Sequence, residues 1–514
     1  MVAATPVAPA PRVGPQTSVA SRSGSLVPAL RATPDADLVA VSVRKAGSSV
    51  VADRHGDQVA AAYGVDLTAV IEAERVRGGT GEIVRVPVLA PAGLPHRFLL
   101  VGIGDGTPRD LRRAAAALGR SARGRHHLAT TLGDGLSAEG ARAVVEGIVL
   151  GAYTPPSAGL KSRAESSPVA QVTLVGQHPE AGLDRGRAHA RAAVLARDLA
   201  ETPSNLKSPA WLAAQAGELG AAAGLEVRIW DEAELAEEGF GGLLAVGSGS
   251  ATPPRFVRLD YRPEGVPARK PIVLVGKGIT YDTGGISIKP RTSMIPMKTD
   301  MSGAAAVLAT LLACPEVGVR RPVTGLLPLA ENAFGAASYR PSDVVTTYGG
   351  QTVEILNTDA EGRMVLADGL GYAVRNLAPE TVVDIATLTG AASQGLGKRH
   401  GALYATADRL AGALIKAGQD SGELLWRMPL VEDYRQALDS TVADLRHVAG
   451  RGTPTSGGGS IVAALFLREF TAGVRWAHLD IAGPARSDRD EYEVTKGATG
   501  FGARLLLRWL EGLR

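Results

Sequence analysis

The sequence predicts an α/β protein with two domains: a smaller N-terminal α/β domain, and a larger C-terminal domain in which helices sandwich a mixed sheet. Apolar or β-branched runs of strand length, such as Phe98–Ile103 and Ile272–Val275, alternate along the chain with amphipathic segments of helical spacing. The 514 residues, 45% hydrophobic and 21% charged, suffice for two or three globular domains with a large core. Such alternation is typical of parallel or mixed sheets covered by helices.

The N-terminal part is expected to contain a tail, a domain and a linker. Residues 1–24 are rich in Ala, Pro, Val and Ser and are predicted to be a disordered tail, without the basic start and apolar core of a signal peptide. Residues 25–180 are predicted to form the N-terminal α/β domain, and residues 181–202 a linker helix. The expected elements of this domain are strands at Leu38–Val43, Glu82–Leu89, Phe98–Ile103 and Val169–Val175, and a helix over Arg109–Gly124.

Residues 203–514 are expected to form the second, larger domain. Its predicted strands are Glu226–Trp230, Phe256–Tyr261, Ile272–Val275, Val323–Leu329, Val353–Leu356, Thr381–Ile385 and Trp476–Ile481. Its predicted helices are Pro209–Ala223, Gly303–Ala313, Val365–Val374, Ser460–Phe470 and Thr499–Leu510.

Composition excludes several classes of protein. The 55 Lys and Arg against 52 Asp and Glu leave a net charge of +3, which by itself indicates neither a nucleic acid nor a membrane partner. No apolar run reaches the roughly 18 residues that a membrane helix needs. The single cysteine, Cys314, excludes an intrachain disulfide and a cysteine-based zinc cluster, and it suits a reducing compartment. We therefore expect a cytoplasmic protein.

One basic cluster departs from this neutral balance. The predicted helix Arg109–Gly124 and the residue that follows it carry six arginines, at positions 109, 112, 113, 120, 123 and 125. The cluster fits a nucleic-acid contact or a solvated helix face. We favour the solvated face, because no aromatic residues are interleaved for base stacking.

The chemically most informative stretch is Asn357–Met364, which reads NTDAEGRM. It lies between a predicted strand and a predicted helix, a position where α/β sheets commonly place their sites. On an extended backbone Asp359 and Glu361 point the same way, and two like charges so close are costly unless a cation lies between them. Taken alone, the motif fits a metal site or a solvated acidic turn, and the second is the commoner case.

A second stretch, Val275–Met301, follows the apolar strand Ile272–Val275. It contains Lys277, Asp282, Lys289, Lys298 and Asp300, and glycines stand at positions 276, 278, 284 and 285. Glycines beside charges indicate a backbone drawn close to a bound group, although a glycine-rich surface loop has the same composition. The phosphate-binding pattern GxxxxGK[ST] is absent, and the nine histidines include no HExxH pair, which excludes the common helix-borne zinc peptidase motif.

These two stretches resemble the leucyl aminopeptidase family, which comprises the cytosol aminopeptidases, dinuclear metallopeptidases of the M17 type. Asn357–Met364 matches the family's NTDAEGR signature, with methionine where leucine is usual. Further matching segments are Gly276–Pro290, Met297–Val307, Leu243–Ser250, Pro328–Asn332, Ala386–Gly390, Asp444–Arg451, Gly457–Phe470 and Trp476–Gly483. The resemblance covers nearly all of residues 200–510 and is weak before residue 180.

The resemblance implies a two-metal site with zinc or manganese. It implies Lys277, Asp282, Asp300 and Glu361 as ligands of the tightly held ion. It implies Asp282, Asp359 and Glu361 as ligands of the exchangeable ion. Lys289 and Arg363 would be catalytic, Lys289 by stabilising the oxyanion and Arg363 by holding a bicarbonate that acts as general base. The implied substrate contacts are Met297, Asn357, Ala360, Thr387 and Leu388. His478 is not among the implied ligands, and we expect a hydrogen-bonded structural histidine there.

The implied activity is removal of the N-terminal residue, leucine among others, from peptides by a water molecule activated between two metal ions. The implied assembly is a homohexamer that binds peptide substrates and no membrane, with nucleic acid an improbable partner. The sequence leaves two alternatives open. One is a DNA-binding accessory role, which only the arginine cluster favours, and the other is a metal hydrolase of another class such as a phosphoesterase.

Overall fold

The computed structural model describes residues 17–33, 35–89, 91–155, 167–450 and 457–513. Most of the predicted tail, residues 156–166 of the predicted N-terminal domain and the last residue of the Asp444–Arg451 match therefore lie outside the described residues. The chain divides into two compact units. Of the described residues, one unit contains those up to 194 together with 488–497, and the other contains those within 195–487 and from 498 onward. The prediction assigns residues 488–497 to the second domain, whereas they pack with the first unit.

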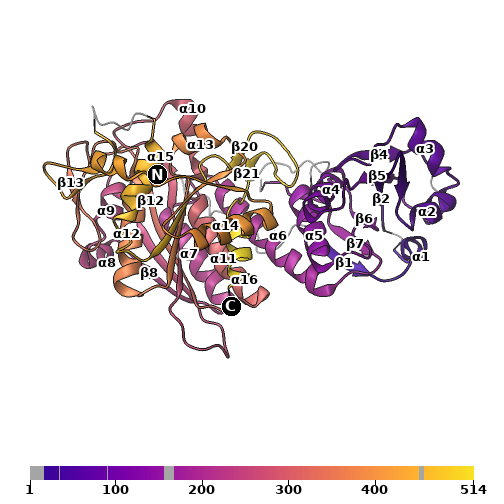
Figure 1. The fold of residues 1–514 in the computed structure, drawn as a ribbon, viewed down its shortest axis with the longest axis horizontal. Helices are drawn as coiled ribbons and strands as arrows, with labels where there is room; N and C mark the ends of the chain where they lie inside the picture. Colours follow the sequence, from indigo (N-terminus) through magenta and orange to yellow (C-terminus); the bar gives the residue numbers. More distant parts are fainter. Residues whose placement is uncertain (1–16, 34, 90, 156–166, 451–456, 514) are drawn as a thin grey trace, which may run out of the picture. The chain divides into compact units, whose positions relative to one another are not determined.

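The first unit is built on a seven-stranded sheet with the strand order β1-β7-β6-β2-β5-β4, and β3 pairs with β2 (Figure 1). Its elements are β1 (Ser18–Arg22), α1 (Leu26–Arg31), β2 (Leu38–Ala46), β3 (Ser49–Ala52), α2 (Gly56–Tyr63), α3 (Leu67–Ala73), β4 (Ile83–Val86), β5 (Phe98–Gly102), α4 (Pro108–Ser121), β6 (His127–Thr130), α5 (Ala138–Ala152) and β7 (Gln171–Val175). The helix α6 (Glu180–Glu201) follows, and it occupies the stretch predicted as a linker helix.

The prediction of a disordered tail is wrong for residues 18–22, which form β1. This strand runs parallel to β7, with Val19 opposite Val172, and Val19 is buried. The pairing supplies the backbone hydrogen bonds and the apolar contact that the Ala- and Ser-rich sequence does not indicate.

The second unit is built on a nine-stranded mixed sheet with the order β17-β16-β19-β15-β10-β12-β9-β8, and β11 pairs with β12. Its elements up to α12 are α7 (Pro209–Ala222), β8 (Glu226–Trp230), α8 (Glu232–Glu238), α9 (Gly241–Gly247), β9 (Arg255–Tyr261), β10 (Ile272–Gly276), β11 (Gly278–Asp282), α10 (Arg291–Met294), η2 (Ile295–Thr299), α11 (Ser302–Val317), β12 (Val323–Asn332), β13 (Val344–Thr346), β14 (Thr352–Glu354) and α12 (Glu361–Asn376). The rest are β15 (Thr381–Ala386), α13 (Gly390–Leu396), β16 (Gly401–Ala405), α14 (Asp408–Ser421), β17 (Leu425–Arg427), η3 (Glu432–Leu438), β18 (Leu445–Arg446), α15 (Gly459–Arg468), β19 (Arg475–Asp480), β20 (Arg486–Ser487), β21 (Gly497–Ala498) and α16 (Ala503–Glu511).

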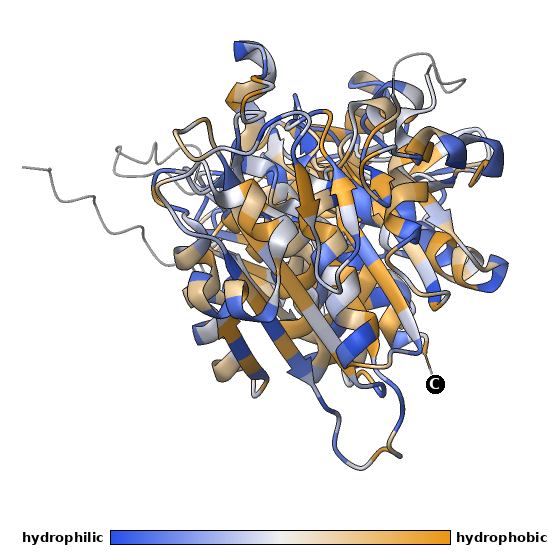
Figure 2. Cartoon of the chain, turned by 90° about the vertical axis from the view of Figure 1, so that its left-hand side faces the viewer, coloured by the Kyte–Doolittle hydropathy of each residue, from blue (hydrophilic) through white to orange (hydrophobic). Residues whose placement is uncertain are grey.

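The centre of this sheet is apolar on both faces, which explains its continuous apolar strands. β10 reads IVLVG, every residue of it is buried, and it runs parallel to β12 and β15. Helices α11 and α16 pack together, with α11 against β10 and β12, while α12 contacts the same strands and packs with α9 and α15. In Figure 2 the ribbons of the central strands are mainly orange, and the ribbons of the surrounding helices include blue, hydrophilic stretches.

One helical stretch, residues 291–317, is long and apolar enough by composition to cross a membrane, and it is the only one among the described residues. Within it, 78% of the apolar window is buried inside the fold, where α11 packs against the sheet and α16. Burial of this extent is typical of a helix in the core of a folded unit.

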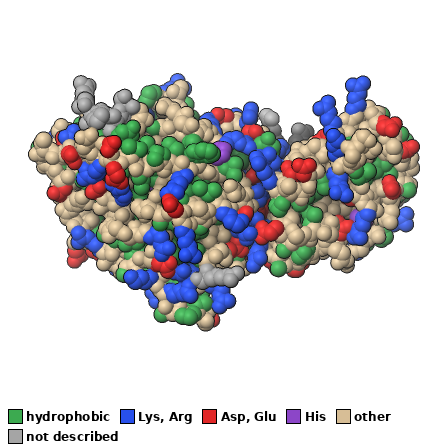
Figure 3. Space-filling model, in the orientation of Figure 1, with side chains coloured by type: hydrophobic (Ala, Val, Ile, Leu, Met, Phe, Trp, Pro, Cys, Tyr) green, Lys and Arg blue, Asp and Glu red, His purple; other side chains and the backbone are tan. Residues whose placement is uncertain are grey.

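The arginines of α4 do not form the solvated face that we favour from sequence. The Arg112 and Glu146 side chains are buried together, and the Arg113 guanidinium lies 3.7 Å from the ring centroid of Tyr492. Arg120 and Arg123 both form ion pairs with Asp490. Much of the cluster is thus used to hold residues 488–497. On the face shown in Figure 3, basic and acidic side chains are interspersed over each unit.

A buried carboxylate, that of Glu423, joins the C-terminal helix α16 to the segment before β17 within the second unit. Glu423 Oε2 accepts hydrogen bonds from the backbone amides of Gly502 and Leu505, both at 2.9 Å, and Oε1 lies 3.2 Å from Arg504 Nε. Glu423 and Arg504 are each 3% exposed. The carboxylate therefore caps the start of α16 from a different element.

We predict that Glu423→Ala lowers the free energy of unfolding by about 3–5 kcal/mol, because it leaves the Arg504 charge buried without its carboxylate. Urea unfolding followed by tryptophan fluorescence measures the change. The control is Asp408→Ala, which removes an exposed carboxylate that pairs with Arg427 and should cost at most about 1 kcal/mol. Equal losses in the two variants would contradict the role of Glu423.

Candidate metal centre

The predicted site residues converge where three parallel elements of the central sheet end. Lys277 lies between β10 and β11, and Asp282 is the last residue of β11. β15 runs parallel to β10, with Ile385 opposite Gly276, so Thr387 follows β15 at the same edge. The carboxyl edge of a parallel sheet is where α/β folds commonly bind ligands.

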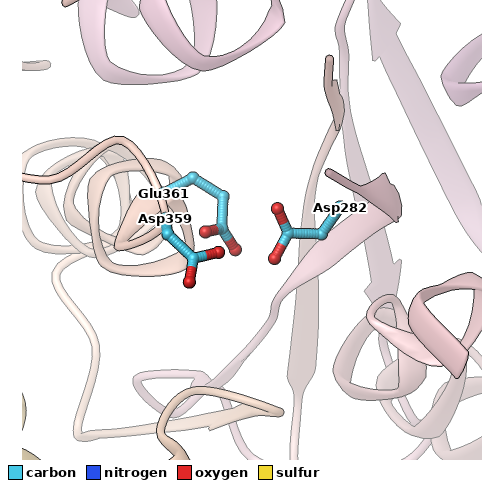
Figure 4. Close-up of side chains that lie close together, drawn as sticks. All are labelled: Asp282, Asp359 and Glu361. Carbon is cyan, nitrogen blue, oxygen red and sulfur yellow. The ribbon is translucent and has the colours of Figure 1, made fainter. Parts of the chain in front are cut away.

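Three carboxylates meet at this edge. One oxygen each of Asp282, Asp359 and Glu361 lie within 4.8 Å of one another, and Figure 4 shows the three side chains pointing toward a common centre. The convergence of Asp359 and Glu361 is as predicted, although not on an extended backbone. Glu361 is the first residue of α12, and Asp359 lies in the turn before it.

Lys277 lies between two acidic residues. Its Nζ is 2.7 Å from Glu361 Oε1 and 2.9 Å from Asp300 Oδ2. It also donates a hydrogen bond of 2.9 Å to the carbonyl of Thr387. Lys277 is 2% exposed, so these partners fix the position of an amine that has no access to bulk water.

Lys289 makes the equivalent contacts on the other side of the cluster. Its Nζ lies 2.9 Å from Asp282 Oδ2 and forms an ion pair with Asp359. This side chain is 14% exposed, and Asp359 is 32% exposed, so the Lys289 side of the site is the more open one.

Hydrogen bonds from neighbouring residues fix the orientation of the clustered carboxylates. Asp282 Oδ1 accepts from Asn332 Nδ2 and from the Gly284 amide, both at 2.8 Å. Asp282 Oδ2 therefore remains for a cation. Asp300 Oδ1 accepts from Thr387 Oγ1 at 2.6 Å, which leaves its Oδ2 on the side of Lys277. Such outer contacts orient ligands and raise their affinity for metal.

Gly362 is required by the path of Lys277. A Cβ atom at position 362 would lie 2.7–2.8 Å from Cε, Cδ and Nζ of Lys277, which is closer than real contacts allow. The lysine side chain therefore runs across the first turn of α12, and only glycine leaves the space for it.

The site has a surplus of negative charge. Asp282, Asp300, Asp359 and Glu361 supply four carboxylates, against the two ammonium groups of Lys277 and Lys289. Burial, together with neighbouring carboxylates, raises the pKa of Glu361 and of Asp300. Burial would lower the pKa of Lys277, but Asp300, Glu361 and Asp282 outweigh it and raise that pKa. The pKa values of the carboxyl groups and of the lysine are all raised, because the carboxylates outnumber the cations.

Oxygen atoms without hydrogen-bond partners fit the same conclusion. Asp300 Oδ2, Asp359 Oδ1 and Glu361 Oε1 are buried and accept no hydrogen bond of good geometry within the part of the chain described, although each lies in an ion pair with a lysine. Buried carboxylates that outnumber the neighbouring cations are a donor set suited to divalent metal ions. The residues present therefore fit a metal centre.

Arg363 lies beside this cluster on α12, 7% exposed. Its Nη1 donates to the carbonyl of His447, and its Nε has no partner among the residues described. Burial lowers the pKa of Arg363 to about 10, with Glu361 and Asp480 acting in the opposite direction, so the guanidinium stays charged at neutral pH. A charged arginine with an unused donor is suited to hold a planar anion.

The other predicted residues are distributed around the same edge. Asn357 Oδ1 accepts from the Asp359 amide at 3.0 Å, and Ala360 is the residue before α12. Met297 lies in η2, which leads into Asp300. Thr387 and Leu388 form the turn after β15. The structure gives positions for these residues, and their roles toward a substrate remain predictions.

His478 is the hydrogen-bonded histidine that we expect. Its Nδ1 lies 2.5 Å from Asp384 Oδ1, and both side chains are fully buried in neighbouring strands. It contributes no atom to the carboxylate cluster.

Two supporting residues were missed in the sequence analysis. Asn332 ends β12, which pairs with β11 so that Asn332 lies opposite Asp282. Asp480 ends β19, beside β15, and accepts from the Leu388 and Thr389 amides. The signal that could have found them is a polar residue at the end of a predicted parallel strand.

Comparison with known proteins places this geometry in a family. Residues 194–507 match the model of the cytosol aminopeptidase family, catalytic domain, and residues 40–156 match that of the N-terminal domain of the same family. The chain is 40% identical over 518 residues to a probable cytosol aminopeptidase of Streptomyces coelicolor, covering 95% of this chain and 97% of the relative. It is 41% identical over 517 residues to one of Nocardia farcinica, covering 97% and 99%.

Two solved structures are similar to this chain over nearly its whole length. The bottromycin maturation enzyme BotP in complex with Mn is 40% identical, with a TM-score of 0.81 over 93% of this chain and 99% of BotP. A tomato leucine aminopeptidase mutant is 31% identical, with a TM-score of 0.84 over 98% of each chain. With its two-domain architecture and its lysine–carboxylate centre, this chain belongs to the cytosol aminopeptidase family and is a metal-dependent aminopeptidase.

Proposed function

We propose that this aminopeptidase is a leucyl aminopeptidase, which releases leucine and other N-terminal residues from peptides at a two-metal site. The observation that supports the two-metal site is the surplus of negative charge at the carboxyl edge of the sheet, where four carboxylates face two lysines. Four carboxylates are enough to offset two divalent ions, and carboxylate oxygens can bridge such ions.

We assign the metal ligands by matching positions in the family. Asp282 and Glu361 would serve both ions, Lys277 and Asp300 would complete the tightly held site, and Asp359 would complete the exchangeable one. The contacts of Lys277 and Lys289 support this division, because each ammonium group lies between the carboxylates of one half of the cluster. A lysine binds metal only as the neutral amine, so metal binding at Lys277 must release its proton.

The chain's own groups then have distinct tasks. Bound divalent ions supply Lewis acidity and lower the pKa of water. Lys289, whose pKa is raised by Asp282 and Glu361 against the effect of burial, stays protonated and offers positive charge to the oxyanion. Asp300 accepts from the free α-amine of the substrate, which accounts for removal of one N-terminal residue.

Arg363 is assigned a bicarbonate that acts as general base. Its buried, charged guanidinium has an unused Nε donor beside Glu361, and a planar anion matches such a group bidentately. Met297, Asn357 and Ala360 are assigned to the pocket for the first side chain, and Thr387 and Leu388 to backbone contacts with the substrate.

We predict that the purified protein hydrolyses a leucine anilide and loses this activity after chelation, because the donor set depends on divalent cations. Anilide release is measured before chelation, after it, and after return of Mn²⁺ or Zn²⁺. A panel of dipeptides in each metal then tests the leucine preference and the native metal. Full activity in a metal-stripped sample would reject the two-metal mechanism.

We predict that Glu361→Ala lowers kcat/KM at least about a hundredfold with the fold retained, because a bridging ligand and a partner of Lys277 are removed together. Anilide kinetics and circular dichroism measure the two effects. Glu218→Ala, which changes an exposed glutamate on α7, serves as the matched control. Wild-type turnover of Glu361→Ala would show that the ligand assignment is wrong.

We propose a cytoplasmic homohexamer as the working form, on the resemblance to the family and on the relatives that are named cytosol aminopeptidases. Light scattering is then expected to give a mass about six times that of the 53.0 kDa chain. A mass of one chain across the tested concentrations would contradict this assembly.

A further inference from the structure

A buried carboxylate stands behind the turn that follows β15. Asp480, the last residue of β19, is 1% exposed and has no ion-pair partner among the residues described. We propose that Asp480 is a positioning residue, which fixes the backbone of the turn Thr387–Thr389 for binding of the substrate's N-terminal residue. This rests on the proposed function, because it takes Thr387 and Leu388 as substrate contacts.

Among the described residues, Asp480 accepts hydrogen bonds from three backbone amides and one side-chain hydroxyl. Oδ1 accepts from the amides of Leu388 at 3.2 Å and Ala482 at 3.1 Å. Oδ2 accepts from Thr389 N at 3.0 Å and Thr389 Oγ1 at 2.6 Å. A carboxylate that accepts several backbone amides makes charge-assisted bonds, which are stronger and more directional than neutral ones. The turn is therefore held by one charge at its back.

The same turn touches the metal-ligand residues at its front. The Thr387 carbonyl accepts from Lys277 Nζ at 2.9 Å, and Thr387 Oγ1 donates to Asp300 Oδ1 at 2.6 Å. Asp480 thus acts on the site through the turn and contacts none of the proposed ligands itself. A displacement of the turn would move the substrate contacts and two ligands together.

The hydrogen bonds also determine what the turn can offer to a substrate. Asp480 uses the amides of Leu388 and Thr389, and Lys277 uses the Thr387 carbonyl. The Leu388 carbonyl accepts no backbone hydrogen bond within the described part of the chain. It is therefore the acceptor that the turn leaves for an N–H group of the bound peptide.

Thr389 completes the arrangement. Its hydroxyl donates to Asp480 and accepts from the Ala392 amide at 3.1 Å, so it also caps α13. One hydroxyl therefore connects the carboxylate, the turn and the following helix.

The test is Asp480→Asn, assayed with leucine anilide at saturating Mn²⁺. The amide keeps one acceptor oxygen but turns an NH₂ donor toward backbone N–H groups, so the turn has to move. We expect kcat/KM to fall about 10- to 100-fold, with most of the change in KM. We also expect weaker binding of the product L-leucine by calorimetry, at the wild-type Mn²⁺ content.

The matched control is Asp368→Asn, which changes another buried carboxylate that accepts backbone amides, from Leu243 and Tyr348, both at 2.7 Å. We expect lower stability and an unchanged KM there. If Asp480→Asn does not fold, Thr389→Val replaces it: loss of the hydroxyl should raise KM, and Thr389→Ser should restore it.

A wild-type KM in Asp480→Asn, or an equal rise of KM in Asp368→Asn, would overturn the role of Asp480. Equal KM values in Thr389→Val and Thr389→Ser would do the same. Failure of the wild-type protein to hydrolyse the anilide would instead remove the proposed function, so the two failures are distinguishable.

Discussion

The whole site depends on one electrostatic constraint: more negative charge is buried at the sheet edge than the chain itself neutralises. Lys277 between Asp300 and Glu361, and Lys289 between Asp282 and Asp359, compensate only part of it. Water cannot reach most of these groups, so the remaining charge is costly unless cations or protons compensate it. The hydrogen bonds from Asn332, Gly284 and Thr387 then determine which oxygens are left to meet them.

The sheet supplies the geometry that this constraint requires. Parallel β10 and β15 bring Lys277 and Thr387 to one edge, and the pairing of β11 with β12 brings Asp282 beside Asn332. Helix α12 begins at Glu361, so its first turn enters the site directly. These contacts join segments distant in sequence, and a shift of register in the strands would separate these side chains.

Many strands and helices of the second unit could be predicted from the sequence, because its strands are strongly apolar and its motifs resemble a known family. The meeting of Asp359 with Glu361 was predicted from their spacing, whereas the meeting of Lys277 with Glu361 was available only through the resemblance, since it depends on sheet register. β1 was missed because its pairing with β7 is not encoded in a local pattern. The arginines of α4 were misjudged because Asp490 and Tyr492 lie far along the chain.

The absence of a side chain at position 362 couples two distant parts of the sequence. Lys277 occupies the volume that any other residue at 362 would take. Neither position can then change alone: a larger residue at 362 would displace Lys277 from Asp300 and Glu361, and a shorter residue at 277 would lose both ion pairs. Positions 277 and 362 are therefore constrained together. Substitutions that an exposed helix surface would tolerate are not tolerated in this buried first turn of α12.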